Sequence, residues 1–205
     1  MEHNILNTIP ILEEFYSIQG EGANSGKATY FVRLGGCDLA CHWCDSKETW
    51  SPENYHYKDI NTIINNAKQT TTSSILVTGG EPLTYNFDEF CRIAKEEQFE
   101  TLLETSGAYN FSGLWDWICL SPKRQKPPKN IFYAIANELK VIIYEPEDLI
   151  WAAECEKKVI NKNMLLYLQP EWSKFELSKE LVIDYVKKNP QWKVSLQIHK
   201  FLNIP

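Results

Sequence analysis

The stretch GGCDLACHWCDS, residues 35–46, contains Cys37, Cys41 and Cys44 in the pattern C-x3-C-x2-C. Three thiolates so close in sequence can converge on one metal centre from a single loop. A closed structural zinc site takes four ligands, and a ferredoxin cluster normally takes four cysteines, but the next cysteine here is Cys91. Three thiolates would leave one iron of a [4Fe–4S] cluster without a protein ligand. The spacing therefore favours a metal centre with an open coordination position, which is where chemistry takes place.

With the aromatic Trp43 before the last cysteine, the pattern resembles the signature of the radical S-adenosylmethionine (SAM) enzymes. The resemblance implies that Cys37, Cys41 and Cys44 bind a [4Fe–4S] cluster. It also implies that the amino and carboxylate groups of SAM chelate the open iron. A zinc knuckle with His42 as fourth ligand is the alternative, but His42 directly follows Cys41, and adjacent side chains rarely reach the same metal.

Composition sets broad limits on the class of protein. The chain has 205 residues, 43% of them hydrophobic and 13% aromatic, which suits one domain with a substantial core. No apolar run is long enough to span a bilayer, and residues 1–4 do not begin a secretion signal, so we expect a cytoplasmic protein without a membrane partner. The formal net charge is -6 and the only basic cluster, residues 122–126, is short, so no nucleic-acid partner is predicted.

The cysteine count also favours a metal site. Six cysteines, three of them clustered, are typical of metal binding rather than disulfides in a cytosolic chain. Cys91 and Cys119 are expected in the core because their neighbours are apolar. The position of Cys155 in a helical pattern leaves its role open.

Residue patterns predict alternating strands and helices. Strands are expected over 9–17, 28–34, 74–78, 101–104, 115–120, 139–144, 164–168 and 194–197. Helices are expected over 58–69, 86–98, 146–159 and 177–188. Asn86 is the expected N-cap of the second helix, with Glu89 as its capping-box partner. Pro146 and Ser178 are expected at the starts of the last two helices.

This alternation predicts an α/β fold with βαβ units and a parallel sheet. Turn sequences fall just after the strands, at the carboxyl ends where such sheets and barrels bind ligands. The repeats are too few for a closed eight-stranded barrel. We therefore predict a partial, shortened (β/α) barrel of the radical SAM type, in a single domain over 1–205 with an N-terminal substrate loop and a C-terminal tail that closes the active site.

Further stretches resemble the 7-carboxy-7-deazaguanine synthase family. They are FYSIQGEG (15–22), FVRLGGC (31–37), CDSKETW (44–50), TGGEP (78–82), ETSG (104–107), SPK (121–123) and QIHKFLNIP (197–205). Together they span essentially the whole chain, and their combination is specific although each short piece alone is weak.

The resemblance implies a carbon–nitrogen lyase reaction. In it, 6-carboxy-5,6,7,8-tetrahydropterin contracts to 7-carboxy-7-deazaguanine with loss of ammonia, a step toward 7-deazapurines such as queuosine. The cluster would reduce SAM, and the resulting 5′-deoxyadenosyl radical would take a hydrogen from the pterin. No side chain is predicted to act as a catalytic acid, base or nucleophile. An external one-electron donor such as a flavodoxin is implied, and so is a homodimer, for which Trp172 and Trp192 are candidate interface residues.

The segment Gly79-Gly80-Glu81-Pro82 ends a predicted strand and presents bare backbone, whose carbonyls can accept hydrogen bonds from the ammonium group of SAM. An ordinary strand-to-helix turn would have the same sequence. Gln169 also ends a strand, and a solvated turn residue is its alternative. The resemblance implies SAM contacts by Trp43, Cys44, Asp45, Gly79, Gly80, Glu81, Gly107, Ser121, Pro122, Lys123 and Gln169.

Substrate contacts are implied for Ile18, Gln19, Gly20, Arg33, Thr105 and Pro205. The planar fork of Arg33 suits a carboxylate, although a surface ion pair is the alternative. The apolar residues Phe201, Leu202 and Ile204 are expected to pack and to carry the carboxylate of Pro205 across the ligand mouth.

A magnesium site is implied at Ser46, where family members carry a hydroxyl just after the third cysteine. One hydroxyl oxygen is a hard ligand of the type Mg²⁺ accepts, and substrate and water would complete the octahedron. The alternative is a hydroxyl that only caps a turn.

Two other functions stay open. A radical SAM activase that generates a glycyl radical on a protein partner would share the cysteine pattern, but would leave the glycine loop at 19–22 unexplained. A non-enzymatic iron–sulfur or zinc module would be recognised by its metal content.

Overall fold

The computed structural model describes residues 7–205, so the expectation for residues 1–4 lies outside the described residues. Within this range, nine strands form one sheet in the order β3-β1-β2-β4-β5-β6-β7-β8-β9. The strands are β1 (Thr8–Ile18), β2 (Ala28–Leu34), β3 (His56–Asp59), β4 (Ser74–Gly79), β5 (Glu100–Thr105), β6 (Trp117–Leu120), β7 (Glu138–Ile143), β8 (Leu165–Pro170) and β9 (Trp192–Val194). The helices are α1 (Ile60–Ala67), α2 (Asp88–Glu96), α3 (Phe132–Ile135), α4 (Glu147–Glu156), α5 (Phe175–Lys188) and α6 (Ile198–Leu202).

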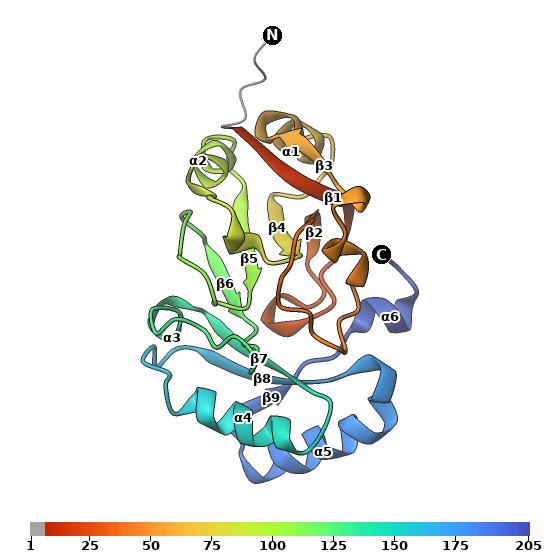
Figure 1. Ribbon diagram of the computed structural model, residues 1–205, viewed down its shortest axis with the longest axis vertical. Coiled ribbons are helices and arrows are strands. Elements are labelled where there is room, and N and C mark those ends of the chain that lie inside the picture. The colour runs from red at the N-terminus through yellow and green to blue at the C-terminus, as the bar shows by residue number, and fades with distance from the viewer. Residues whose placement is uncertain (1–6) are drawn as a thin grey trace.

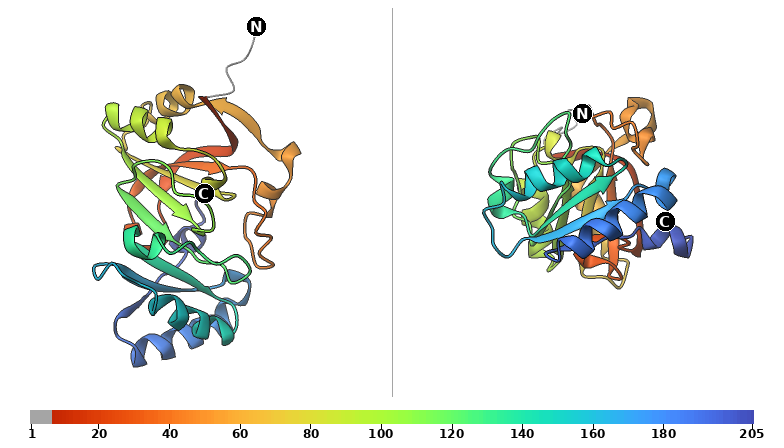
Figure 2. Two further views of the ribbon diagram at one scale, coloured as in Figure 1. Left: turned by 60° about the vertical axis from the view of Figure 1, so that its left-hand side comes forward. Right: turned by 90° about the horizontal axis from the view of Figure 1, so that it is seen from below.

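The sheet is parallel except at its first edge. β1 runs antiparallel to both β2 and β3, and every pairing from β2 to β9 is parallel. Figures 1 and 2 show the sheet curled, with α1 and α2 outside its first strands and α4 and α5 outside β7–β9. Because parallel strands end at the same edge, the turns after them meet on one side of this curled sheet. The predicted α/β partial barrel is confirmed.

Apolar residues of the sheet and helices form the core. In α1 the buried side chains are Ile60, Ile63, Ile64 and Ala67, which is the i, i+3, i+4, i+7 spacing of one helix face. Asp59 caps this helix by accepting a hydrogen bond from the Thr62 amide at 3.2 Å. Among residues 7–205, no helix is both long and apolar enough to cross a membrane.

The loop after β1 lies against the other end of the curled sheet. The Gly22 amide donates to Ser195 Oγ at 2.9 Å, and the Ala23 amide donates to the Glu138 carboxylate at 2.7 Å. The Ile198 amide donates to the Gly20 carbonyl at 3.0 Å. Gly22 has φ +61, which favours glycine, and a Cβ there would lie 2.4 Å from the Glu138 carboxylate and would displace it. These bonds tie the first strand to the last ones.

Several element boundaries differ from the sequence-based predictions. The capping box at Asn86 and Glu89 is wrong, because α2 starts at Asp88 and Glu89 pairs instead with Arg92. The fifth helix starts at Phe175 rather than Ser178, because the Glu171 side chain accepts amide hydrogen bonds just before it.

At the C-terminal end, the strand predicted over 194–197 lies at Trp192–Val194 instead, and the short helix α6 follows it. The strand predicted over 115–120 begins only at Trp117, because the Asp116 side chain turns to accept from the Thr101 amide at 2.9 Å. The edge strand β3 was not predicted.

The three isolated cysteines all belong to the interior. Cys91, Cys119 and Cys155 are buried, which confirms the expectation for the first two and decides the third. Trp192 is also buried, at 1% exposed, and its indole nitrogen donates to Glu156 at 2.9 Å. Trp192 was therefore wrongly considered as a surface aromatic, whereas Trp172 is 38% exposed.

Candidate active site

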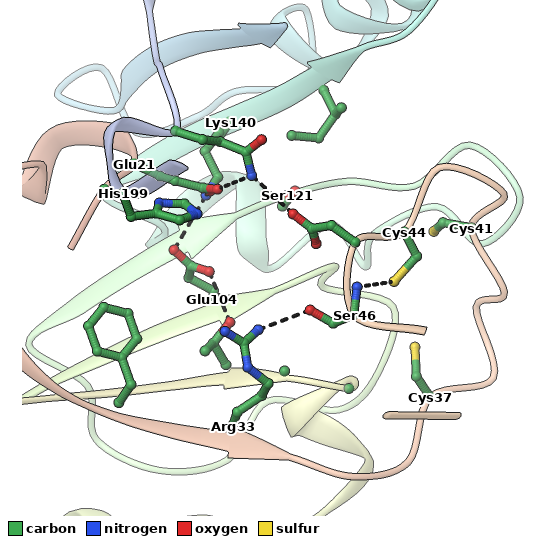
Figure 3. A pocket seen from close by; sticks show the side chains of 18 of the residues that line it. Glu21, Arg33, Cys37, Cys41, Cys44, Ser46, Glu104, Ser121, Lys140 and His199 are labelled. Atoms are coloured by element: carbon green, nitrogen blue, oxygen red, sulfur yellow. Dashed lines mark hydrogen bonds and ion pairs between the residues drawn. The ribbon is translucent and has the colours of Figure 1, made fainter. Parts of the chain in front are cut away.

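A cavity of about 370 Å³ opens at the carboxyl ends of the strands (Figure 3). The cysteine loop and the turns after β4, β5 and β6 all contribute to its lining. All but two of the predicted site residues, Gly107 and Pro122, line the cavity. Those that line it are Ile18, Gln19, Gly20, Arg33, Cys37, Cys41, Trp43, Cys44, Asp45, Ser46, Gly79, Gly80, Glu81, Thr105, Ser121, Lys123, Gln169 and Pro205.

The cysteine loop follows β2 and is held by its own backbone. The Cys44 amide donates to the Cys41 carbonyl at 2.9 Å, and the Ser46 amide donates to the Cys44 sulfur at 3.4 Å. All three thiols are free and line the cavity. Burial raises the pKa of the Cys37 and Cys44 thiols.

These thiols fit a cluster better than a single ion. Within residues 7–205, no three His, Cys, Asp or Glu side chains lie close enough together to hold one metal ion. A cubane cluster needs less convergence, because each thiolate binds a different iron. The His42 ring packs edge-on against Tyr144, with ring centroids 4.7 Å apart, rather than completing a zinc site.

The glycine turn after β4 is fixed against the cysteine loop. The Gly80 amide donates to the Leu34 carbonyl at 2.9 Å, and the Glu81 amide donates to the Gly36 carbonyl at 2.9 Å. The Glu81 carboxylate is 2% exposed and accepts from the Ser106 amide at 2.8 Å and from the Thr105 hydroxyl. Glu81 and Thr105 therefore join the ends of β4 and β5 on the cavity wall.

Two predicted SAM contacts lie outside the cavity lining. Gly107 has φ +73, and a Cβ there would meet the side chains of Leu120, Pro128 and Phe132. Its glycine is explained by turn conformation and packing. Pro122 is buried beside the turn and does not line the cavity either.

Lys123 lies on the cavity wall next to Trp43. Its Nζ donates to the Ser121 carbonyl at 2.8 Å and to the Ser121 hydroxyl at 2.7 Å, and it lies 5.2 Å from the centre of a Trp43 ring. Burial lowers the pKa of Lys123. Gln169 is 2% exposed and accepts from the Ser195 hydroxyl at 2.8 Å, so it is no solvated turn residue.

Arg33 lines the cavity between the cysteine loop and β1. Its Nε donates to Glu13 at 2.7 Å, its Nη1 donates to Ser46 Oγ at 2.9 Å, and its guanidinium lies 5.8 Å from the Phe15 ring centre. Ser46 is buried beside it. The guanidinium is thus held in one orientation by an ion pair, a hydroxyl and an aromatic ring.

The sequence-based prediction missed a buried charge cluster on the cavity floor. The Lys140 ammonium group, 3% exposed, pairs with Glu21 and lies 3.3 Å from Glu104. Burial alone would lower the pKa of Lys140, but the charges of Glu104 and Glu21 raise it well above its ordinary value. Burial would raise the pKa of Glu21, but Lys140 lowers it. Both shifts favour the charged forms of Lys140 and Glu21, which therefore form an ion pair.

The neighbours of this cluster were missed as well. Gln197 donates to Glu21 at 2.7 Å and to Asp45 at 3.0 Å, which links the floor to the cysteine loop. Lys200 donates to Asp45 at 2.9 Å, and its charge holds the pKa of Asp45 below the ordinary value although burial opposes this. His199 lines the cavity, and burial lowers its pKa. The sequence did contain a sign of the charge cluster. Glu138 and Lys140 alternate with apolar residues in β7, so their side chains lie on the face of the strand opposite to the apolar ones.

At the C-terminus, Pro205 lines the cavity, while the residues before it pack only in part. The Ser17 hydroxyl donates to the Pro205 backbone oxygen at 2.9 Å. Phe201 is 54% exposed and contacts Trp172 and Phe175, and Leu202 is 58% exposed. The expected packing of the tail is therefore found for Phe201, which lies on two aromatic rings, but not for Leu202, which remains exposed.

The chain is similar to known proteins over nearly its whole length. Residues 18–126 match the family described as a 4Fe-4S single cluster domain. The 7-carboxy-7-deazaguanine synthase of Flavobacterium psychrophilum is 51% identical and covers 96% of this chain and 93% of its own. That of a Synechocystis species is 44% identical, with 95% and 93% covered. The crystal structure of QueE from Escherichia coli has the same fold, with a TM-score of 0.82 at 24% identity over 93% of this chain and 94% of its own. The chain belongs to the 7-carboxy-7-deazaguanine synthase family of radical SAM enzymes.

Proposed function

We propose that this chain converts 6-carboxy-5,6,7,8-tetrahydropterin to 7-carboxy-7-deazaguanine with loss of ammonia. The observation that carries the proposal is the composition of one cavity, which has three free thiols on one wall and Arg33 and Lys140 on the others. A metal centre and a polar, carboxylate-bearing substrate can therefore occupy adjacent parts of the same space.

The chain's residues fit the cofactors of such a reaction. Cys37, Cys41 and Cys44 would hold the [4Fe–4S] cluster, and the Gly79–Gly80 backbone, Trp43 and Gln169 would border SAM. When bound, these cofactors supply a radical that takes a hydrogen atom from the pterin. The protein's part is to bind, orient and exclude water.

Arg33 and the floor cluster are suited to orient the pterin. The Arg33 guanidinium is already aligned and can bind the substrate carboxylate through its planar fork. The side-chain oxygens of Glu21 and Glu104 can accept hydrogen bonds from pterin N–H groups, and the Lys140 ammonium group can donate to an oxygen. Because these groups are fixed before substrate arrives, little reorganisation is needed.

Turnover by anaerobically reconstituted protein tests the proposal. Wild-type protein with SAM and a reductant should form 7-carboxy-7-deazaguanine, detected by absorbance and mass spectrometry. Arg33→Lys keeps the charge and loses the fork, so we expect a raised KM with the cluster and SAM binding retained. Protein that is loaded with iron and sulfide but leaves the carboxy-tetrahydropterin unchanged would contradict the proposal. It would leave the glycyl-radical activase as the alternative.

We further propose a Mg²⁺ contact at Ser46. Its hydroxyl lies on the cavity wall beside Arg33, and substrate oxygens and water could supply the remaining ligands. Chelation should lower the wild-type rate, and Ser46→Ala should weaken the response to added Mg²⁺. Ser112→Ala removes a hydroxyl that bonds only backbone in the turn before β6 and should respond as wild type does. An unaffected wild-type rate after chelation would reduce Ser46 to a turn residue.

The carboxylate of Pro205 is proposed as a further substrate contact. Pro205 lines the cavity and is held by Ser17, so its carboxylate is placed near the open mouth. A short C-terminal extension keeps every side chain and moves this charge away. We expect a raised KM with SAM binding intact, and wild-type kinetics in the extended protein would remove Pro205 from the substrate site.

Two kinds of protein partner are proposed, an electron donor and a second copy of this chain. An external one-electron donor such as a flavodoxin should support turnover in place of a chemical reductant. A homodimer could cover the aromatic group of Trp172, Phe175 and Phe201, in which Trp172 and Phe201 are exposed. Light scattering on wild type and on Phe201→Ser tests the homodimer, because a monomeric wild type would rule the dimer out.

A further inference from the structure

A tight turn over residues 123–126 faces the cysteine loop. The Lys126 amide donates to the Lys123 carbonyl at 3.3 Å, and the two residues form an isolated antiparallel bridge. The turn presents Gln125, whose Nε2 lies 3.0 Å from the Leu39 carbonyl oxygen and 3.1 Å from Cys41 Sγ. Two parts of the cysteine loop are thus contacted by one side-chain amide.

The chemistry of these contacts fixes the direction of the hydrogen bonds. The carbonyl oxygen of Leu39 can only accept, and the Cys41 sulfur is a thiolate acceptor when it binds a metal. The amide nitrogen of Gln125 has two hydrogens, one for each acceptor. Only the orientation with nitrogen toward the loop satisfies both partners.

The turn itself is held on its other side. Lys126 Nζ lies 2.9 Å from Asp38 Oδ2 and 2.6 Å from the Tyr109 hydroxyl, which also bonds Asp38. The Lys126 ammonium lies 4.0 Å from the Tyr109 ring centre. Gln125 is therefore presented by an anchored turn although its side chain is exposed.

We propose that Gln125 is a positioning residue that donates an N–H···S hydrogen bond to the cluster ligand Cys41 and raises the reduction potential of the cluster. The inference rests on the proposed function, since it assumes the cluster at these cysteines. One-electron reduction adds negative charge to a cluster and its sulfurs, so a donor to a ligand sulfur stabilises the reduced state more than the oxidised state. Gln125 thereby makes the cluster easier to reduce.

A redox titration tests this without measuring turnover. Gln125→Leu removes the donor at similar size, and Gln125→Glu keeps the shape but replaces the donor with a carboxylate. Each protein is reconstituted anaerobically, its iron and sulfide are quantified, and the reduced signal is followed by electron paramagnetic resonance against potential, without SAM. We expect both variants to shift to more negative potential, the glutamate further.

Two controls separate the hydrogen bond from loop anchoring. Gln191→Leu makes the same exchange at an exposed glutamine that donates to Glu156 at 2.9 Å. Tyr109→Phe removes one tie between the turn and Asp38 but leaves the Gln125 donor. Both should titrate at the wild-type potential.

The outcomes are distinct. A fully loaded Gln125→Leu protein at the wild-type potential would overturn the inference, and so would an equal shift in Tyr109→Phe. If neither Gln125 variant keeps a cluster that wild type holds, Gln125 anchors the loop and has no tuning role. A wild type without any reducible cluster would instead refute the proposed function.

Discussion

Gly80→Ala should separate the glycine turn after β4 from the cysteine loop, against which it packs. A Cβ at residue 80 would lie 2.1 Å from the carbonyl oxygen of Gly36 and 2.8 Å from its carbonyl carbon. Ordinary contact begins at 3.4 Å, so the two backbones would have to part by roughly 1 Å. Because the obstacle is backbone and no flexible side chain, rotation about χ angles cannot relieve it.

The cost can be worked from the bonds at this junction. Overpacking of this kind costs about 1–3 kcal/mol. The hydrogen bonds Gly80 N to Leu34 O and Glu81 N to Gly36 O, both 2.9 Å, span the same gap, and losing each costs about 0.5–1.5 kcal/mol. We therefore expect the free energy of unfolding to fall by about 2–6 kcal/mol. SAM binding should be lost, because the glycine turn and the cysteine loop no longer meet.

Urea unfolding of the metal-free chain and calorimetric SAM binding by the reconstituted protein measure the two effects. Gly26→Ala is the matched control, since its Cβ would meet nothing within 4 Å and only the positive φ of +91 opposes it. That variant should lose about 1–2 kcal/mol and keep its affinity for SAM. A loss below about 1 kcal/mol in Gly80→Ala, with wild-type SAM affinity, would refute the reasoning.

Three further predictions concern buried groups. Lys140→Met leaves the Glu21 and Glu104 carboxylates unpaired, so the free energy of unfolding should fall by about 3–5 kcal/mol in urea titrations at pH 7; an unchanged midpoint would contradict this. The pKa of Glu21 is lowered in the folded chain, so the ionised carboxylate stabilises the folded state. This contribution is complete above the unfolded pKa of 4.5 and is lost as pH falls through the folded pKa. Urea unfolding midpoints should therefore be flat near neutrality and fall in acid. Cys91→Ala should keep full iron and sulfide content and lose only about 1 kcal/mol of stability, whereas loss of the cluster would place Cys91 among its ligands.

Local patterns were enough to predict most of the fold. The helix α1 was recognised from its buried stripe, and β2 was predicted with the bounds it has, because aromatic and β-branched residues fill it. The cysteine loop and the glycine turn are also local, so their place at strand ends followed from the alternation of elements.

Short or edge elements and long-range contacts could not be found in this way. The strand β3 has exposed polar residues and pairs with the sheet only through β1, so it lacks an apolar pattern. The helix α6 spans five residues, too few to show helical periodicity. Lys140 meets Glu21 and Glu104, which lie 119 and 36 residues away in sequence, and no window contains all three.

Stability alone does not explain the charge cluster on the cavity floor. Removing an ammonium and two carboxylates from water costs several kcal/mol per ion, and apolar residues of similar volume are often equally stable or better. Lys140 packs no better than a methionine would, and its contribution to stability lies only in its pairing with Glu21 and Glu104. What the cluster provides is a set of fixed charges beside the cavity, held by Gln197 and by Gln19, whose Nε2 lies 3.1 Å from Glu104. We infer that Lys140 stands at an inward position of β7 for the ligand that the cavity receives. The charges there are aligned before binding, so the cost of arranging them has already been met in folding.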